Sequence, residues 1–209
     1  MKSFKTATET IPSLLPLFLL FIVHACNDTT AHTKKTEAVK MIYLQPFNDV
    51  SKAQTDRMYQ ELKKFYTAIE VKSPIALPRA AYYAPRNRYK ADSLIHFLKG
   101  HTAGNNVTIG ITNKDISTTK GPHADFGIMG LAYRPGKACV VSSYRLTKGN
   151  KPEEFFKVAI HELGHTQGLP HCPVTTCFMR DAAGGNPLRE EKGFCEKCKA
   201  VLVSKGWKL

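Results

Sequence analysis

The chain has 209 residues, 43% of them hydrophobic, which suffices for one domain with a buried core. Its formal net charge of +13 favours anionic partners, but the lysines and arginines are scattered singly or in short groups such as Lys63 and Lys64. Because the chain has no dense basic run with interleaved aromatic residues, the sequence argues against a nucleic-acid-binding protein, and we expect no nucleic-acid partner.

The first 26 residues have the pattern of a secretory signal. Two lysines precede a mostly apolar run from residue 11 to 23, which two prolines interrupt and which is short for a membrane span. The run leads into VHAC (23–26), which resembles the lipobox of bacterial lipoproteins. That resemblance implies a signal peptide at 1–25 and a lipid on Cys26, which would anchor the protein in the membrane of the bacterial cell envelope. There are two alternatives: the segment could be a plain signal peptide of a secreted protein, or it could be an uncleaved membrane anchor.

Residues 26–38 are polar and small, and we interpret them as a flexible tether before a domain at 39–209. The domain opens with a predicted strand, VKMIYLQPF (39–47), rich in apolar and β-branched residues. A helix capped by Ser51 then follows, and its apolar spacing predicts that it runs to about Ile69.

The middle of the domain alternates between predicted helices and strands. In chain order we expect a helix at 89–100, a strand at 105–112, and two strands within 126–146 joined by a turn at 134–136. Another helix starts at 150–154, where a proline and two glutamates follow Asn150. This alternation predicts a mixed α/β sheet.

The stretch IHELGHTQGLPHC (160–172) contains a set of metal ligands. His161 and His165 are four residues apart, so a helix places both imidazoles on one face, within reach of one ion. Gly168 allows the chain to end the helix and turn back, which would bring His171 to the same ion. Three neutral imidazoles leave the fourth position of a tetrahedral zinc ion open for water.

Glu162 follows the first histidine and is rotated away from the ligand row. Zinc lowers the pKa of its bound water to roughly 7, so we expect Glu162 to take the proton of that water as general base during hydrolysis of a peptide bond. The three histidines, Glu162 and Gly168 match the metzincin pattern H-E-x-x-H-x-x-G-x-x-H in full. The sequence therefore predicts a zinc metallopeptidase that acts on a peptide or protein substrate.

Four cysteines follow the third histidine in two short pairs: Cys172 with Cys177, and Cys195 with Cys198. Two such pairs suit a tetrahedral zinc site with four thiolate ligands. In an exported protein the four cysteines could instead form two disulfides, or the last pair could be a redox pair. Cys139 lies in an apolar stretch, where we expect an inert buried thiol.

The cysteine that directly follows the third histidine, the Cys-x-Met that ends at Met179 and the downstream Cys-x-x-Cys resemble the pattern of the archaemetzincins, a branch of the metzincin metallopeptidases. The resemblance covers most of residues 39–209. It implies an α/β fold with a mixed, mostly parallel twisted sheet, an antiparallel edge strand, flanking helices and a zinc-binding active-site helix. It also implies two zinc ions per chain, a catalytic one on the histidines and a structural one on the four cysteines.

The same resemblance assigns Met179 to a turn beneath the catalytic metal. It also implies an edge strand that pairs with extended substrate, for which Gly127 to Tyr133 is the candidate. Asp115 and His123 lie near predicted strand ends, and we expect each to be a capping or surface residue.

Two functions of other classes stay open from the sequence: a non-catalytic zinc-binding envelope protein, and a zinc hydrolase that acts on a non-peptide amide. Glu162 argues against the first, because zinc binding alone does not need that carboxylate. We expect a monomer.

Overall fold

The computed structural model describes residues 41–209, which belong to one compact unit. The predicted signal peptide, the predicted lipidation site Cys26 and the predicted tether lie outside the described residues, as do the first two residues of the strand predicted at 39–47. None of the helices in the described part of the chain is long and apolar enough to cross a membrane.

The helices are α1 (Lys52–Lys63), α2 (Ala91–Gly100), α3 (Lys151–Thr166) and α4 (Glu196–Val203), with short 3-10 helices η1 (Arg79–Ala81) and η2 (Ala84–Arg86). The strands are β1 (Ile42–Pro46), β2 (Ile69–Val71), β3 (Tyr82–Tyr83), β4 (Arg88–Lys90), β5 (Val107–Thr112), β6 (Ile116–Lys120), β7 (His123–Ile128), β8 (Gly130–Ala132) and β9 (Ala138–Ser142).

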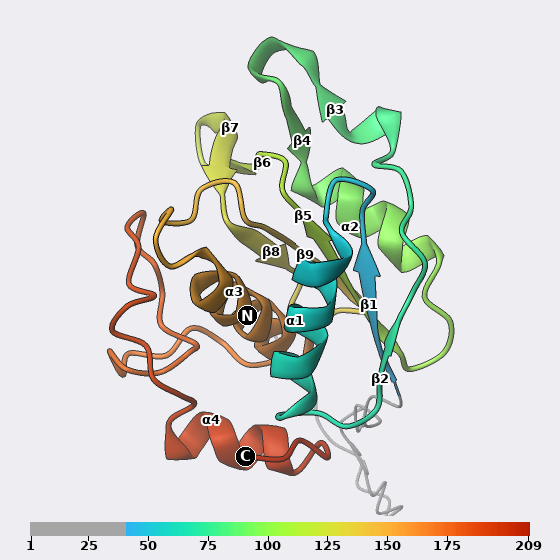
Figure 1. The fold of residues 1–209 in the computed structure, drawn as a ribbon. Helices are drawn as coiled ribbons and strands as arrows, with labels where there is room; N and C mark the ends of the chain where they lie inside the picture. The colour runs from blue at the N-terminus through green and yellow to red at the C-terminus, as the bar shows by residue number, and fades with distance from the viewer. Residues whose placement is uncertain (1–40) are drawn as a thin grey trace, which may run out of the picture. The chain divides into compact units, whose positions relative to one another are not determined.

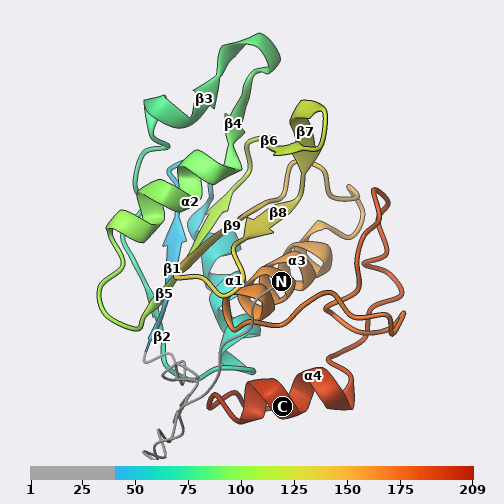
Figure 2. The same cartoon turned by 180° about the vertical axis from the view of Figure 1, so that it is seen from behind.

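The main sheet has the strand order β2-β1-β5-β9-β8. Its first four strands are parallel, and β8 pairs antiparallel with β9 at one edge. Helices α1 and α3 lie on one face of this sheet and α2 lies on the other, as the two opposite views show (Figures 1 and 2). This arrangement confirms the predicted mixed, mostly parallel sheet with an antiparallel edge strand and flanking helices.

Successive residues of the central strands contribute to different halves of the core. Ile109 and Val141 pack with residues of α1 and α3, whereas Val140 packs with residues of α2. Gly110 allows α2 to lie close to the sheet, because a Cβ there would be 2.6 Å from Leu98 Cδ1. Both faces of β5 are buried, which explains its nearly continuous run of apolar and small residues.

Helix α1 begins as predicted but ends earlier than predicted. Ser51 and Gln54 form a capping box at its start. The helix ends at Lys63, and Ile69 instead opens β2, where it pairs with Ile42 of β1. The apolar residues that continued the helical pattern, among them Tyr66, lie in the loop after α1 and still contribute to the core.

The predicted strand from Gly127 to Tyr133 is two strands in two sheets, so its predicted extent is wrong. Residues up to Ile128 belong to β7, which forms a hairpin with β6 in a second sheet of order β3-β4-β6-β7. Residues from Gly130 to Ala132 form β8, the edge of the main sheet. Both pieces are edge strands, but only β8 lies at the edge of the main sheet.

Asp115 ties the second sheet to the loop after β9. It is 5% exposed, and its carboxylate lies 2.7 Å from Arg145 Nε and 3.0 Å from a terminal nitrogen of Arg88. The expected capping or surface role of Asp115 is therefore wrong, because two guanidinium groups compensate the buried charge. His123 is exposed at the start of β7, as expected.

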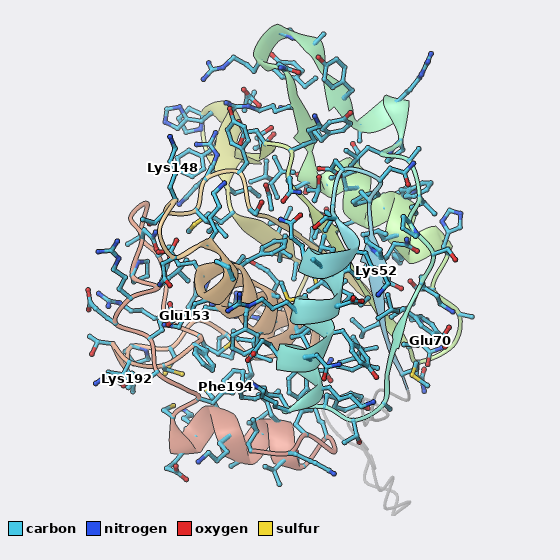
Figure 3. The ribbon with its side chains drawn as sticks, viewed as in Figure 1. Lys52, Glu70, Lys148, Glu153, Lys192 and Phe194 are labelled. Atoms are coloured by element: carbon cyan, nitrogen blue, oxygen red, sulfur yellow. The ribbon has the colours of Figure 1, made fainter. Side chains whose placement is uncertain are left out.

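The C-terminal segment closes the core beside the end of α1. The ring of Trp207 lies 5.4 Å from that of Tyr66, and the Lys208 amide donates to the Phe65 carbonyl at 2.8 Å. Phe194, labelled just above α4 in Figure 3, lies 5.3 Å from the ring of Phe178. The residues just before and just after α4 are thereby held against the core.

Candidate metal centre and cleft

Helix α3 carries the first two histidines through the core. Of its sixteen residues, twelve are buried, including Glu162 and His165. Gly164 gives this helix room for Met179, because a Cβ at Gly164 would lie 2.4 Å from the Met179 sulfur. Met179 is fully buried and packs directly under the helix turn that carries the histidines.

The turn after α3 brings the third histidine back to the first two. Gly168 has a φ of +95°, and the Leu169 amide donates to the Gly164 carbonyl at 3.1 Å. The ring centroids of His161, His165 and His171 lie 4.6, 4.8 and 5.4 Å apart in pairs, and one donor nitrogen from each lies within 4.8 Å of the others. The structure therefore brings together all three histidines that the motif singled out.

Each of these histidines has a protein oxygen atom beside its Nδ1 atom, and this oxygen orients the ring. His161 Nδ1 lies 2.6 Å from the Phe178 carbonyl oxygen, and His165 Nδ1 lies 2.8 Å from the Leu169 carbonyl oxygen. A carbonyl only accepts, so both Nδ1 atoms donate and both Nε2 atoms keep a free lone pair. His171 Nδ1 lies 3.4 Å from an Asp181 carboxylate oxygen.

The electrostatics favour neutral imidazoles at His161 and His165. Burial lowers the pKa of His161 to about 3, and the neighbouring His165 acts in the same direction. Burial also lowers the pKa of His165. Neutral, oriented imidazoles on one side of a cleft are the donor set that zinc takes in catalytic sites, so the residues fit a zinc ion.

The side chain of Glu162 extends from α3 toward the edge strand β8. Its side chain reaches Gly130, where a Cβ would be 2.6 Å from the Glu162 Oε1 atom. The residue is 7% exposed, and burial raises the pKa of its carboxyl to about 8. A carboxyl with this pKa beside three histidines can accept and release a proton near neutral pH.

The histidines and Glu162 line a cleft of about 500 Å³. The edge strand β8, the β6–β7 hairpin and the loop at 180–188 line it as well. Sequence patterns did not single out five charged side chains that also line this cleft: Lys120, Arg145, Arg180, Asp181 and Glu191. Asp181 had the best signal, because it lies two residues after Met179.

The four cysteines after the third histidine also lie together. One sulfur from each lies within 4.8 Å of the others, and the Cys172 and Cys195 sulfurs are 3.6 Å apart. That distance exceeds the roughly 2.05 Å of a disulfide, and the five cysteines of the described residues are free thiols. The amides of Met179 and Cys195 lie 3.5 and 3.4 Å from the Cys177 sulfur, as donors to a thiolate would.

Hydrogen bonds favour the ionised form of the Cys195 thiol. Burial by itself raises its pKa, but hydrogen bonds from the Cys198 backbone and from the neighbouring cysteines lower it to about 7. Cys195 also stands at the N-terminus of α4, where a negative charge is favoured. The group suits a metal with four thiolate ligands. Cys139 lies apart from it, fully buried in β9 as expected, and burial raises the pKa of its thiol.

Comparison with known proteins agrees with this geometry. The model of peptidase family M54 matches residues 35–204. The archaemetzincin of Methanopyrus kandleri is 32% identical over 152 residues, which cover 70% of this chain and 85% of that protein. Its crystal structure superposes with a TM-score of 0.68 at 27% identity, over 82% of this chain and 97% of that chain. The Archaeoglobus fulgidus archaemetzincin, solved with malonate, gives a TM-score of 0.67 at 28% identity, over 77% and 99%.

The fold and the histidine site define a zinc metallopeptidase. More specifically, the chain belongs to peptidase family M54, the archaemetzincins.

Proposed function

We propose that the protein hydrolyses peptide bonds at the centre formed by His161, His165 and His171, with Glu162 as general base. The observation that carries this proposal is the position of the Glu162 carboxylate, which is buried against Gly130 and lines the same cleft as the three histidines. When bound there, a zinc ion would lower the pKa of a water molecule to roughly 7 and polarise the substrate carbonyl.

The protein's own groups complete the site. Glu162 takes the proton of the attacking water and delivers a proton to the leaving amine. The edge strand β8 is hydrogen-bonded only to β9 among the described strands, and its residues line the cleft. Its free backbone groups can therefore pair with an extended peptide and hold the scissile bond beside the histidines. No feature of the described residues favours the non-catalytic or the non-peptide alternative.

The proposal includes a second, structural zinc ion on Cys172, Cys177, Cys195 and Cys198. Its support is the approach of the four sulfurs and the amides that point at Cys177. Metal analysis of the full chain should then give two zinc ions per chain. One zinc ion together with four oxidised cysteines would remove this second site.

We further propose that the chain is a monomer anchored through a lipid on Cys26. The support is the signal-like sequence that ends in VHAC (23–26). Labelling with radioactive palmitate in a bacterial host should mark the wild-type chain and not the Cys26→Ser variant. Equal labelling of both would contradict lipidation at this residue. The monomer is tested separately by sedimentation equilibrium, where the mass of a dimer would contradict it.

The peptidase activity itself is tested with a peptide library read by mass spectrometry. The zinc-loaded full chain should cut peptides, a chelator should stop the cleavage, and added zinc should restore it. Cleavage of amide-containing cell-wall fragments without cleavage of any peptide would favour the non-peptide hydrolase instead.

A further inference from the structure

The cleft extends beyond the histidines along α3. Val158 lies three residues before His161 on this helix, and it lines the cleft together with Leu188 and Glu191 of the loop before α4. Val158 is 5% exposed, Leu188 4% and Glu191 2%. This part of the cleft therefore combines apolar side chains with one deeply buried carboxyl group.

The carboxyl group of Glu191 has an unused acceptor. Its Oε2 atom is buried and has no hydrogen-bond partner among the described residues. Burial raises the pKa of this carboxyl to about 7, although Lys157 and Arg180 oppose the rise. A buried acceptor without a partner is costly, so a donor or cation that entered the cleft here would be bound favourably.

The two neighbouring cations are already engaged elsewhere. Lys157 Nζ lies 2.7 Å from Glu153 Oε1, and it donates to the Leu188 carbonyl at 2.7 Å. Glu153 is labelled beside α3 in Figure 3. An Arg180 terminal nitrogen lies 2.5 Å from Glu190 Oε2. Two cations and three carboxyl groups thus leave one negative charge when all are ionised, and Glu191 is the group that carries it unpaired.

We propose that Glu191 makes this part of the cleft a specificity pocket for a basic side chain, lysine or arginine, of the peptide substrate. The inference rests on the proposed peptidase function and deepens it. The ammonium or guanidinium group would pair with Glu191 Oε2, and the methylene stem would contact Val158 and Leu188. A neutral side chain of the same length would leave the carboxyl group unpaired.

The test uses peptide pairs that differ only in lysine against norleucine, placed in turn on each side of the bond that is cut. At the position that occupies the pocket, the wild-type kcat/KM should favour lysine by about tenfold or more, because norleucine leaves a buried polar group unpaired. Glu191→Gln should bring the two peptides to within about twofold of each other. Glu190→Gln is the matched control, since this neighbour is paired with Arg180 at the surface, and it should keep the wild-type preference.

The comparison of lysine and norleucine peptides with the wild-type protein tests the proposed pocket even if the Glu191 variant fails to fold. Equal or better cleavage of norleucine peptides at every position would overturn the pocket. Binding of hydrolysis-resistant versions of the same peptides, measured by calorimetry, separates this inference from the peptidase proposal. Tighter binding of the lysine peptide without cleavage of any peptide would refute the activity and keep the pocket, whereas equal binding would refute the pocket.

Discussion

The Phe178 carbonyl oxygen lies 2.6 Å from His161 Nδ1, so the residue between Cys177 and Met179 orients the first histidine of the metal centre. The cysteine cluster is also joined to the third histidine, because Cys172 follows His171 directly and its amide donates to the Met179 carbonyl at 2.7 Å. Cys172 and Cys177 therefore share one stretch of backbone with the groups that position His161 and His171, so we expect a change in the cysteine cluster to reach the histidines.

Loss of a cysteine should therefore weaken the histidine site. Cys198→Ser should lower the zinc content from two ions to one, and the remaining ion should be lost to a chelator about ten times faster, as when partners that orient a ligand are removed. Cys139→Ala is the control, because it removes a buried thiol outside the cluster. Retention of the histidine-site metal at the wild-type rate would show that the two clusters are independent.

A methyl group at Gly130 should displace the general base. The Cβ of Gly130→Ala would lie 2.6 Å from Glu162 Oε1, so the carboxylate must move away from the cleft. We expect kcat to fall about 10²-fold with zinc content unchanged, because a shift of about 1 Å in a catalytic group costs this much. Gly149→Ala is the matched change, since its Cβ would meet no atom within 4 Å. Equal activity of the two variants would exclude this position for the base.

The carboxylate of Asp181 should hold the third histidine in its ligand orientation. Asp181→Ala removes the acceptor 3.4 Å from His171 Nδ1. We expect the affinity for zinc to fall about tenfold. This is the lower end of the usual effect of losing a partner that orients a metal ligand, because both side chains are about half exposed. Asp181→Asn keeps an acceptor oxygen, so its zinc affinity should fall less than that of Asp181→Ala. Competition with a fluorescent chelator measures both affinities, and identical values for the two variants would contradict this role.

The preference for a basic side chain should depend on pH. Because the pKa of Glu191 is raised to about 7, its carboxyl is mostly protonated at pH 6 and mostly ionised at pH 8. The lysine substrate keeps its charge over this range, and the charged groups near Glu191 are Lys157 and Arg180, each paired with a glutamate. The ratio of kcat/KM for lysine over norleucine should rise from pH 6 to pH 8 in the wild type and stay flat in Glu191→Gln. A ratio that falls with pH would contradict the assignment.

Features set by local spacing were predictable from the sequence. The four-residue interval between His161 and His165 needs only a helix, and the return of His171 needs only a residue such as Gly168 that adopts a positive φ. The alternation of apolar segments likewise predicted the main sheet. In each case neighbours along the chain carry the information.

Features set by distant pairing were not predictable in this way. The second sheet depends on β4 pairing with β6, and Asp115 is buried only because Arg88 and Arg145 approach it from other parts of the chain. The predicted helix α1 was too long, because apolar residues of the loop that follows it still face the core and continue the helical pattern. Glu191 lies in an irregular loop, so no periodicity marked its burial.

The most direct measurement compares wild type with Glu162→Gln, both loaded with zinc, on the best peptide from the library. The substitution keeps the size of the side chain beside Gly130 but removes the proton acceptor. We expect equal zinc content in the two proteins and a fall in kcat of at least about 10²-fold, the lower bound for loss of a general base. Cleavage at the wild-type rate by a variant with full zinc content would contradict the mechanism.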